Sequence, residues 1–145
     1  MPTTHGSALW QGGIKDGKGA ISTKSGALKD YPYGFSSRFE GKPGTNPEEL
    51  IGAAHAGCFS MAFSKGLADA GFTPNSVETT AKVHLEKQAD GFAIPRIELE
   101  TDAVVPGIDE ATFAQQAETA KKNCPVSKAL AGVTISLIAR LSQGT

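Results

Sequence analysis

The sequence predicts an α+β fold in a single domain that covers residues 1–145. Stretches in which apolar and polar residues alternate predict strands in both halves of the chain. Two longer stretches with helix-start signals predict helices between them. No repeat, low-complexity segment or long linker divides the chain, which favours one domain of mixed strands and helices.

The first forty residues are predicted to form short strands. Residues 7–11 and 20–23 flank a segment rich in glycine and lysine, a pattern typical of a hairpin. A third strand is expected at Phe35–Phe39, where apolar and polar residues partly alternate after the turn signal Tyr31-Pro32-Tyr33-Gly34.

A long helix is expected over about residues 47–70. Asn46 can cap it, Pro47 fits the first helical position, and Glu48 and Glu49 place negative charge on the first turn. Gly71 is the expected stop. Apolar residues occur nearly all round the helix, so we expect it to be buried. Small residues that would allow another backbone to approach closely are Ala53, Ala54, Ala56, Gly57, Ala62 and Ala68.

The second half begins with period-two alternation from Ser76, followed by a turn at 88–91 and a returning strand at 92–105. Pro95 is expected to mark an edge or a bulge in that strand. Asp109 should cap a helix over about 110–122. A short helix is expected at 124–130, and a last strand rich in β-branched residues at 134–141.

Composition excludes several classes of function. The formal net charge is -1, and charges of both signs are spread along the chain, so neither nucleic acid nor a membrane surface is an expected partner. The longest apolar stretch, near residues 51–63, is too short and too mixed to span a bilayer. The first residues lack the pattern of a signal peptide, so we expect a cytoplasmic protein. There, Cys58 and Cys124 should be free or working thiols.

The residues around the two cysteines predict different reactivities. Cys124 lies at an expected helix start beside Lys121 and Lys122, which favours a thiolate. Cys58 lies in mid-helix, so a reactive Cys58 would need a cation brought to it by the fold. The residues alone leave open that both cysteines are simply small buried hydrophobes.

A zinc site is a second interpretation of the same region. His55 and Cys58 share a helix face, and Cys124 could supply a third ligand. No fourth ligand lies at a tight spacing and no CxxC pair is present, which argues against zinc. We therefore expect neither a metal nor another cofactor, and we interpret His55 as a packed, hydrogen-bonded histidine.

Two long segments resemble a known family. Residues 45–60, which include Asn46-Pro47-Glu48-Glu49 and His55-Ala56-Gly57-Cys58, resemble the first-cysteine segment of the OsmC/Ohr family. Asn123-Cys124-Pro125-Val126-Ser127 resembles the second. The resemblance continues at 33–41, 70–74 and 105–109, and it is strongest to the OsmC branch.

This resemblance implies a thiol peroxidase that reduces organic hydroperoxides and hydrogen peroxide in oxidative and osmotic stress. It implies that Cys58 forms a sulfenic acid, that Cys124 resolves it as a disulfide, and that Arg38 and Glu48 attend the Cys58 thiolate. It also implies curved antiparallel β-sheets around two central helices, an intertwined homodimer, and a dithiol reductant of the lipoyl type.

Arg38 is the better match for the family's arginine because the first hairpin, where the Ohr branch carries it, holds only Lys15 and Lys18. A guanidinium would supply the cation that Cys58 lacks, and Glu48 would hold it. Ten helical positions between Glu48 and Cys58 correspond to about 15 Å of rise, so Glu48 can reach the Cys58 site only through a long arginine or from a second chain. We expect the second arrangement, in which Arg38 and Glu48 complete the site of the other chain. Alternatively, Arg38 is a surface arginine and Glu48 a favourable first-turn acid.

Other functions stay open at this point. Five aromatic residues could form an apolar pocket for organic peroxides or could simply be core, namely Tyr33, Phe35, Phe39, Phe59 and Phe63. A redox sensor that signals through a Cys58–Cys124 disulfide and a non-catalytic dimer that binds a small ligand are the alternatives. The combination of Cys58, Cys124, Arg38 and Glu48 favours the enzyme, because a binding protein would not require all four.

Overall fold

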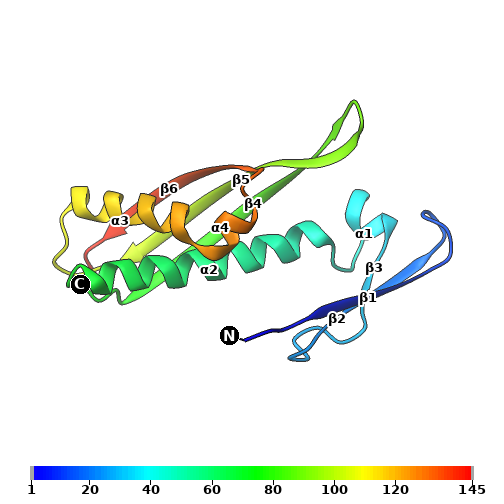
Figure 1. Cartoon of the computed structure of the whole chain (residues 1–145), viewed down its shortest axis with the longest axis horizontal. Coiled ribbons are helices and arrows are strands. Elements are labelled where there is room, and N and C mark those ends of the chain that lie inside the picture. Colours follow the sequence, from blue (N-terminus) through cyan, green and yellow to red (C-terminus); the bar gives the residue numbers. More distant parts are fainter. Residues whose placement is uncertain (1, 145) are drawn as a thin grey trace. The chain divides into compact units, whose positions relative to one another are not determined.

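The structure is a computed structural model that describes residues 2–144. The chain divides after Leu50 into two compact units, which we call the N-terminal unit and the C-terminal unit. Figure 1 shows their elements. Within residues 2–144, no helix is long and apolar enough to cross a membrane.

The N-terminal unit contains a three-stranded antiparallel sheet in the order β1 (Gly6–Gln11), β2 (Lys18–Thr23) and β3 (Tyr31–Tyr33). The predicted hairpin is confirmed, with Gly6 opposite Thr23 and Gln11 opposite Lys18. Gly19 allows this pairing because a Cβ there would come within 2.3 Å of the Tyr33 ring and 2.7 Å of the Trp10 ring.

The predicted strand at residues 35–39 is wrong, because this segment is the short helix α1 (Phe35–Phe39). Ser37 explains the difference. Its hydroxyl accepts a hydrogen bond from the Gly34 N–H at 2.9 Å and lies 2.8 Å from the Thr45 carbonyl oxygen. The Arg38 N–H donates to the Gly34 carbonyl at 3.0 Å, which closes the helical turn. These bonds outweigh the weak alternation of the sequence.

Helix α2 (Pro47–Asp69) confirms the long predicted helix. The Asn46 side chain accepts a hydrogen bond from the Glu49 N–H at 2.8 Å, as expected of its cap. The expectation that the helix is buried all round is wrong for a single chain, because the sheet and α3 cover only one side. The opposite side is exposed and consists mainly of small residues, with Ala53, Ala54, Gly57, Met61 and Lys65.

The C-terminal unit contains a second sheet in the order β4 (Ser76–Gln88), β5 (Gly91–Val104) and β6 (Thr134–Ser142). Strands β4 and β5 form the predicted antiparallel hairpin. The expectation of antiparallel sheets is wrong for β6, which pairs parallel to β5 from Arg96 opposite Thr134 onward. The chain leaves β5 through the helices α3 (Glu110–Asn123) and α4 (Pro125–Ala129), and such a helical crossover returns it in the same direction.

Pro95 occupies the position expected of a strand proline. The register of the β4–β5 pair shifts between His84 and Glu86, opposite this proline, which confirms a bulge. Pairing with β6 begins at Arg96, one residue later, so Pro95 removes no donor from that ladder.

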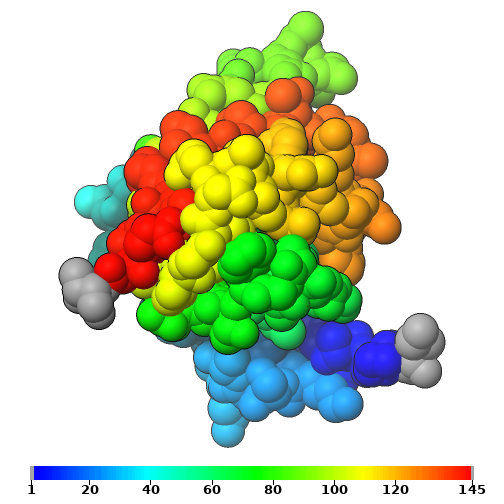
Figure 2. All heavy atoms as spheres, turned by 90° about the vertical axis from the view of Figure 1, so that its left-hand side faces the viewer, coloured from blue at the N-terminus to red at the C-terminus, as the bar shows by residue number. Residues whose placement is uncertain are grey.

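One face of the second sheet packs against α2 and α3. Both helices and β5 contribute fully buried side chains to this core, among them Phe59, Phe63, Leu67, Ile97 and Phe113. Gly52 brings α2 close to β4, because a Cβ there would lie 3.2 Å from the Ala81 carbonyl oxygen. Figure 2 shows α3 lying against the C-terminal half of α2 at the surface.

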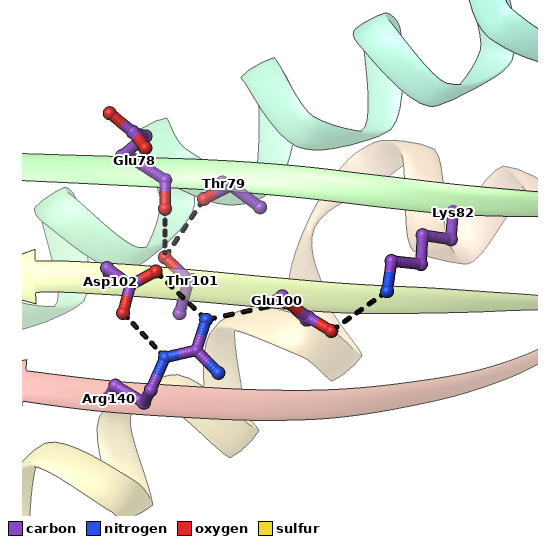
Figure 3. Close-up of polar contacts among 7 residues, drawn as sticks. All are labelled: Glu78, Thr79, Lys82, Glu100, Thr101, Asp102 and Arg140. Carbon is purple, nitrogen blue, oxygen red and sulfur yellow. Dashed lines mark hydrogen bonds and ion pairs between the residues drawn. The ribbon is translucent and has the colours of Figure 1, made fainter.

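Polar contacts fix the sheet on both of its faces. Towards α2, the Ser60 hydroxyl lies 2.7 Å from that of Thr79, which lies 3.0 Å from that of Thr101. On the opposite face, Arg140 binds Asp102 through two hydrogen bonds of 2.6 and 3.0 Å (Figure 3). The hydrophobic side therefore faces the helices, and the charged side faces solvent.

Candidate active site

The structure brings Cys58 and Cys124 together inside the C-terminal unit. Cys58 is half-buried in the middle of α2, and Cys124 is fully buried at the position that caps α4. Both are free thiols, and they lie near enough to each other for each to affect the pKa of the other. The Cys124 N–H donates to the Ala120 carbonyl at 2.9 Å, which anchors this thiol to the end of α3.

The two thiols have different surroundings, which shift their pKa values in opposite directions. Burial raises the pKa of Cys58, and so does the hydrogen bond to Cys124, in which the Cys58 thiol is the donor. Burial also opposes ionisation of Cys124, but hydrogen bonds from Cys58, from the N–H and hydroxyl of Ser127, and from the backbone of Val126 outweigh it and lower its pKa. These directions agree with the interpretation of the sequence, which favoured a thiolate at Cys124 over the mid-helix Cys58.

Cys58 opens onto a pocket of about 570 Å³ between α2 and α3. The pocket is lined by apolar and polar side chains, including Met61, Ala62, Lys65, Gln116 and Asn123. The half-buried Cys58 is thus the cysteine that a small molecule can approach from this side, while the buried Cys124 lies behind it.

Arg38 and Glu48 form a second pair, inside the N-terminal unit. Arg38 Nε donates to Glu48 Oε1 at 3.0 Å, and Arg38 Nη2 donates to Glu48 Oε2 at 3.1 Å. This two-point ion pair fixes the plane of the guanidinium, which also lies 5.4 Å from the centre of the Phe39 ring. The Glu48 side chain is only 10% exposed, whereas the Arg38 side chain is 37% exposed. The arginine is therefore held by the acid while a face of it stays accessible.

The aromatic residues considered for a pocket divide into two groups. Tyr33, Phe35 and Phe39 line a pocket of about 250 Å³ beside Arg38 in the N-terminal unit. Phe59 and Phe63 are fully buried in the core of the C-terminal unit. The pocket interpretation therefore fits the first three residues, and the core interpretation fits the other two.

The four predicted site residues thus form two pairs, one in each unit. Sequence reasoning missed Ser127, whose hydroxyl lies 2.8 Å from His55 Nε2. The spacing of Cys124 and Ser127, three positions apart across the start of α4, was the available signal. His55 is buried and hydrogen-bonded, as expected, and burial lowers its pKa. Among the described residues 2–144, no three histidine, cysteine or acidic side chains gather as metal ligands would.

Comparison with known proteins connects this site to a family. The OsmC-like protein family model matches residues 39–138, which include α2 and both cysteines. The chain is 59% identical over 125 residues to peroxiredoxin OsmC of Escherichia coli K12, covering 86% of this chain and 87% of that protein. It is 32% identical over 116 residues to an organic hydroperoxide resistance protein-like protein of Staphylococcus aureus MSSA476, covering 79% and 81%.

Solved structures have the same fold. The organic hydroperoxide resistance protein OhrB of Bacillus subtilis superposes with a TM-score of 0.71 at 26% identity, covering 95% of this chain and 98% of that one. An OsmC-like protein from Mycoplasma pneumoniae superposes with a TM-score of 0.76 at 14% identity, covering 98% and 99%. With its two-cysteine site and an OsmC-like segment that covers more than half of its length, the chain belongs to the OsmC-like protein family.

Proposed function

We propose that the protein is a thiol-dependent hydroperoxide reductase whose peroxidatic residue is Cys58 and whose resolving residue is Cys124. The observation that carries this proposal is the pair of neighbouring free thiols, one of which lines a pocket. The relatives named a peroxiredoxin and a hydroperoxide resistance protein support the same activity.

The chemistry proceeds in two steps. The Cys58 thiolate attacks one oxygen of the hydroperoxide, the O–O bond breaks, and an alcohol or water leaves after protonation. The Cys58 sulfenic acid is then attacked by the Cys124 thiolate, which forms the disulfide and releases water. A dithiol reductant returns both thiols to the reduced state, and a lipoyl-type dithiol is our candidate for it. The expected setting is the cytoplasm under oxidative or osmotic stress.

In this proposal the positive charge of Arg38 favours ionisation of the Cys58 thiol. Burial and the neighbouring Cys124 raise the pKa of Cys58 within the C-terminal unit, so the first step requires a positive charge that favours its thiolate. A guanidinium held by Glu48 supplies that charge and can donate hydrogen bonds to the peroxide oxygens. The aromatic pocket beside Arg38 would receive the organic group of the substrate.

We further propose that the functional unit is a homodimer, in which Arg38 and Glu48 of one chain complete the Cys58 site of the other. The exposed small-residue side of α2, where Met61 is 78% exposed, suits close packing against a second helix. Glu48 and Cys58 lie ten positions apart on α2, about 15 Å along the axis. In this arrangement residues 1–145 of each chain act as one OsmC-like domain.

Consumption of tert-butyl hydroperoxide in the presence of a dithiol tests the activity. The wild type should turn over, whereas Cys58→Ser should be inactive and should form no sulfenic acid. Ser60→Ala is a matched control on the same helix, because the Ser60 hydroxyl is hydrogen-bonded to Thr79 on the sheet. Unaltered turnover in Cys58→Ser would exclude Cys58 as the peroxidatic residue.

A mixed dimer tests the sharing of sites. One chain carries Arg38→Ala and the other Cys58→Ser, and each homodimer should be nearly inactive. If sites are shared, the mixed dimer contains one complete site, formed by Cys58 of the first chain and Arg38 of the second, and activity returns to about half of the wild type. If each site is built from one chain, the mixed dimer stays inactive.

A further inference from the structure

We propose that Thr45 is a positioning residue for Arg38, because it binds together the segments that hold the Arg38–Glu48 ion pair in place. The inference rests on the proposed function, in which the Arg38 guanidinium favours the Cys58 thiolate. Thr45 acts in this account only through the geometry of the guanidinium, so it is not a catalytic residue.

All three polar groups of Thr45 are hydrogen-bonded, each to a different element of the N-terminal unit. Its N–H donates to the Pro32 carbonyl in β3 at 2.9 Å. Its carbonyl accepts a hydrogen bond from the Ser37 hydroxyl in α1 at 2.8 Å. Its hydroxyl donates to Glu49 Oε2 in the first turn of α2 at 2.6 Å. Thr45 is only 2% exposed, so the loss of a partner would leave a buried polar group unsatisfied.

The bonds of Thr45 end one residue away from each member of the ion pair. Ser37 directly precedes Arg38 on α1, and Glu49 directly follows Glu48 on α2. Arg38 in turn donates to Glu48 through Nε at 3.0 Å and through Nη2 at 3.1 Å. Covalent and hydrogen bonds thus form a closed ring through these five residues, with the ion pair on one side and Thr45 on the other.

The residues on either side of Thr45 connect the same two helices. Gly44 has a φ of 128°, and a Cβ there would come within 3.0 Å of the Ser37 Cβ, so glycine allows the loop to approach α1 closely. The Asn46 side chain donates to the Ser37 carbonyl at 3.4 Å and accepts from the Glu49 N–H at 2.8 Å. The whole segment 44–46 therefore holds α1 against the start of α2.

The ion pair needs this support to keep one geometry. Helix α1 has only five residues, too few to be stable as an isolated helix. The Arg38 side chain is long, flexible and partly exposed, and partly exposed ion pairs contribute little to stability by themselves. The anchoring of both backbones by Thr45 therefore decides where the guanidinium lies. It also gives a fixed direction to Nη1, which takes no part in the bonds to Glu48.

The substitution Thr45→Val removes the hydroxyl and keeps the branched shape of the side chain, so only the bond to Glu49 is lost directly. A thiol at the ordinary pKa of about 8.5 is about 3% ionised at pH 7, so complete loss of the Arg38 charge slows the oxidation of Cys58 about 30-fold. A guanidinium that is present but displaced should slow it less, about threefold to tenfold, and should move the rise of the rate to higher pH.

The first measurement is the rate of Cys58 oxidation by tert-butyl hydroperoxide from about pH 6 to about 9. Thr45→Val should show the slower rate and the shifted profile, and so should Ser37→Ala, which removes the bond at the α1 end. Thr45→Ser keeps a hydroxyl and should restore most of the rate. Thr112→Val is the matched control, because it removes a threonine–carboxylate bond of 2.7 Å to Asp109 at the start of α3. Its profile should follow the wild type.

The second measurement needs no turnover. In the nitrogen–proton NMR spectrum of the reduced protein, the Arg38 Nε–H signal is assigned by its absence in Arg38→Ala. This proton is bonded to Glu48, so it should exchange slowly with water in the wild type and several-fold faster in Thr45→Val. Thr45→Ser should restore the slow exchange, and Thr112→Val should leave it unchanged.

Two results would overturn the role of Thr45. The first is wild-type exchange of the Arg38 Nε–H in Thr45→Val. The second is a wild-type pH profile of Cys58 oxidation in Thr45→Val while Arg38→Ala shows its shift. If Thr45→Val does not fold, Ser37→Ala decides both comparisons in its place. A wild-type profile in Arg38→Ala would instead contradict the proposed role of the guanidinium, so the two failures are distinguishable.

Discussion

Replacement of Arg38 by alanine should slow the oxidation of Cys58 in a way that depends on pH. Burial and donation to Cys124 raise the pKa of Cys58 within its own unit. A thiol at the ordinary value of about 8.5 is only about 3% thiolate at pH 7. If Arg38 supplies the missing charge, Arg38→Ala should therefore react about 30-fold more slowly at pH 7, because the thiolate is the nucleophile.

The pH dependence of the Cys58 oxidation rate distinguishes a change in thiol ionisation from a general loss of structure. The rate of Arg38→Ala should rise about tenfold per pH unit until the raised pKa is reached, because the thiolate fraction rises by that factor. The wild-type rate should level off at lower pH. The assay is rapid mixing of reduced protein with tert-butyl hydroperoxide from pH 6 to about 9, followed by mass analysis of the quenched protein. Arg140→Ala, which breaks an ion pair with Asp102 on the outer face of the sheet, is the matched control. Identical pH profiles for Arg38→Ala and wild type would refute the reasoning.

Three further substitutions test other parts of the account. Cys124→Ser should complete one turnover and accumulate oxidised Cys58, seen as an oxygen adduct by mass spectrometry; rapid multiple turnover would contradict a resolving role. Glu48→Gln loses the charge that holds Arg38 while keeping a side chain of similar shape, so Cys58 oxidation should be slower than in wild type and faster than in Arg38→Ala. Phe63→Ala removes a fully buried ring that lies 5.2 Å from Phe113, and urea denaturation should show a loss of about 3–5 kcal/mol in the free energy of unfolding. A loss below about 1 kcal/mol would show that the core around α2 repacks.

Local signals predicted most of the elements because their determinants are close in sequence. Asn46, Pro47 and the two glutamates that follow define the start of α2, and Asp109 defines that of α3 through its bond with the Thr112 N–H. The segment at 35–39 was not predictable in this way. The serine and phenylalanine residues there fit a strand as well as a helix, and Ser37 decides between them by its contact with Thr45, eight residues later.

The pairing of β6 could not be predicted either, because it depends on contacts between residues that are far apart in the chain. The β-branched residues at 134–141 predict a strand, but its parallel partner is set by the path through α3 and α4. In the site, the motifs identified Cys58, Cys124, Arg38 and Glu48, and the structure added which of them are in contact. The relative acidity of the two thiols depends on their burial and on how close they lie to each other in the fold, which the sequence does not give.

The measurement that tests the central claim most directly is the product of one equivalent of hydroperoxide. Fully reduced wild-type protein is mixed with one equivalent of tert-butyl hydroperoxide, free thiols are blocked, and the digested peptides are mapped by mass spectrometry. The account predicts that a peptide pair joined between Cys58 and Cys124 forms in proportion to the tert-butanol released. Release of tert-butanol with both cysteines still reduced, or no reaction with the peroxide at all, would contradict it.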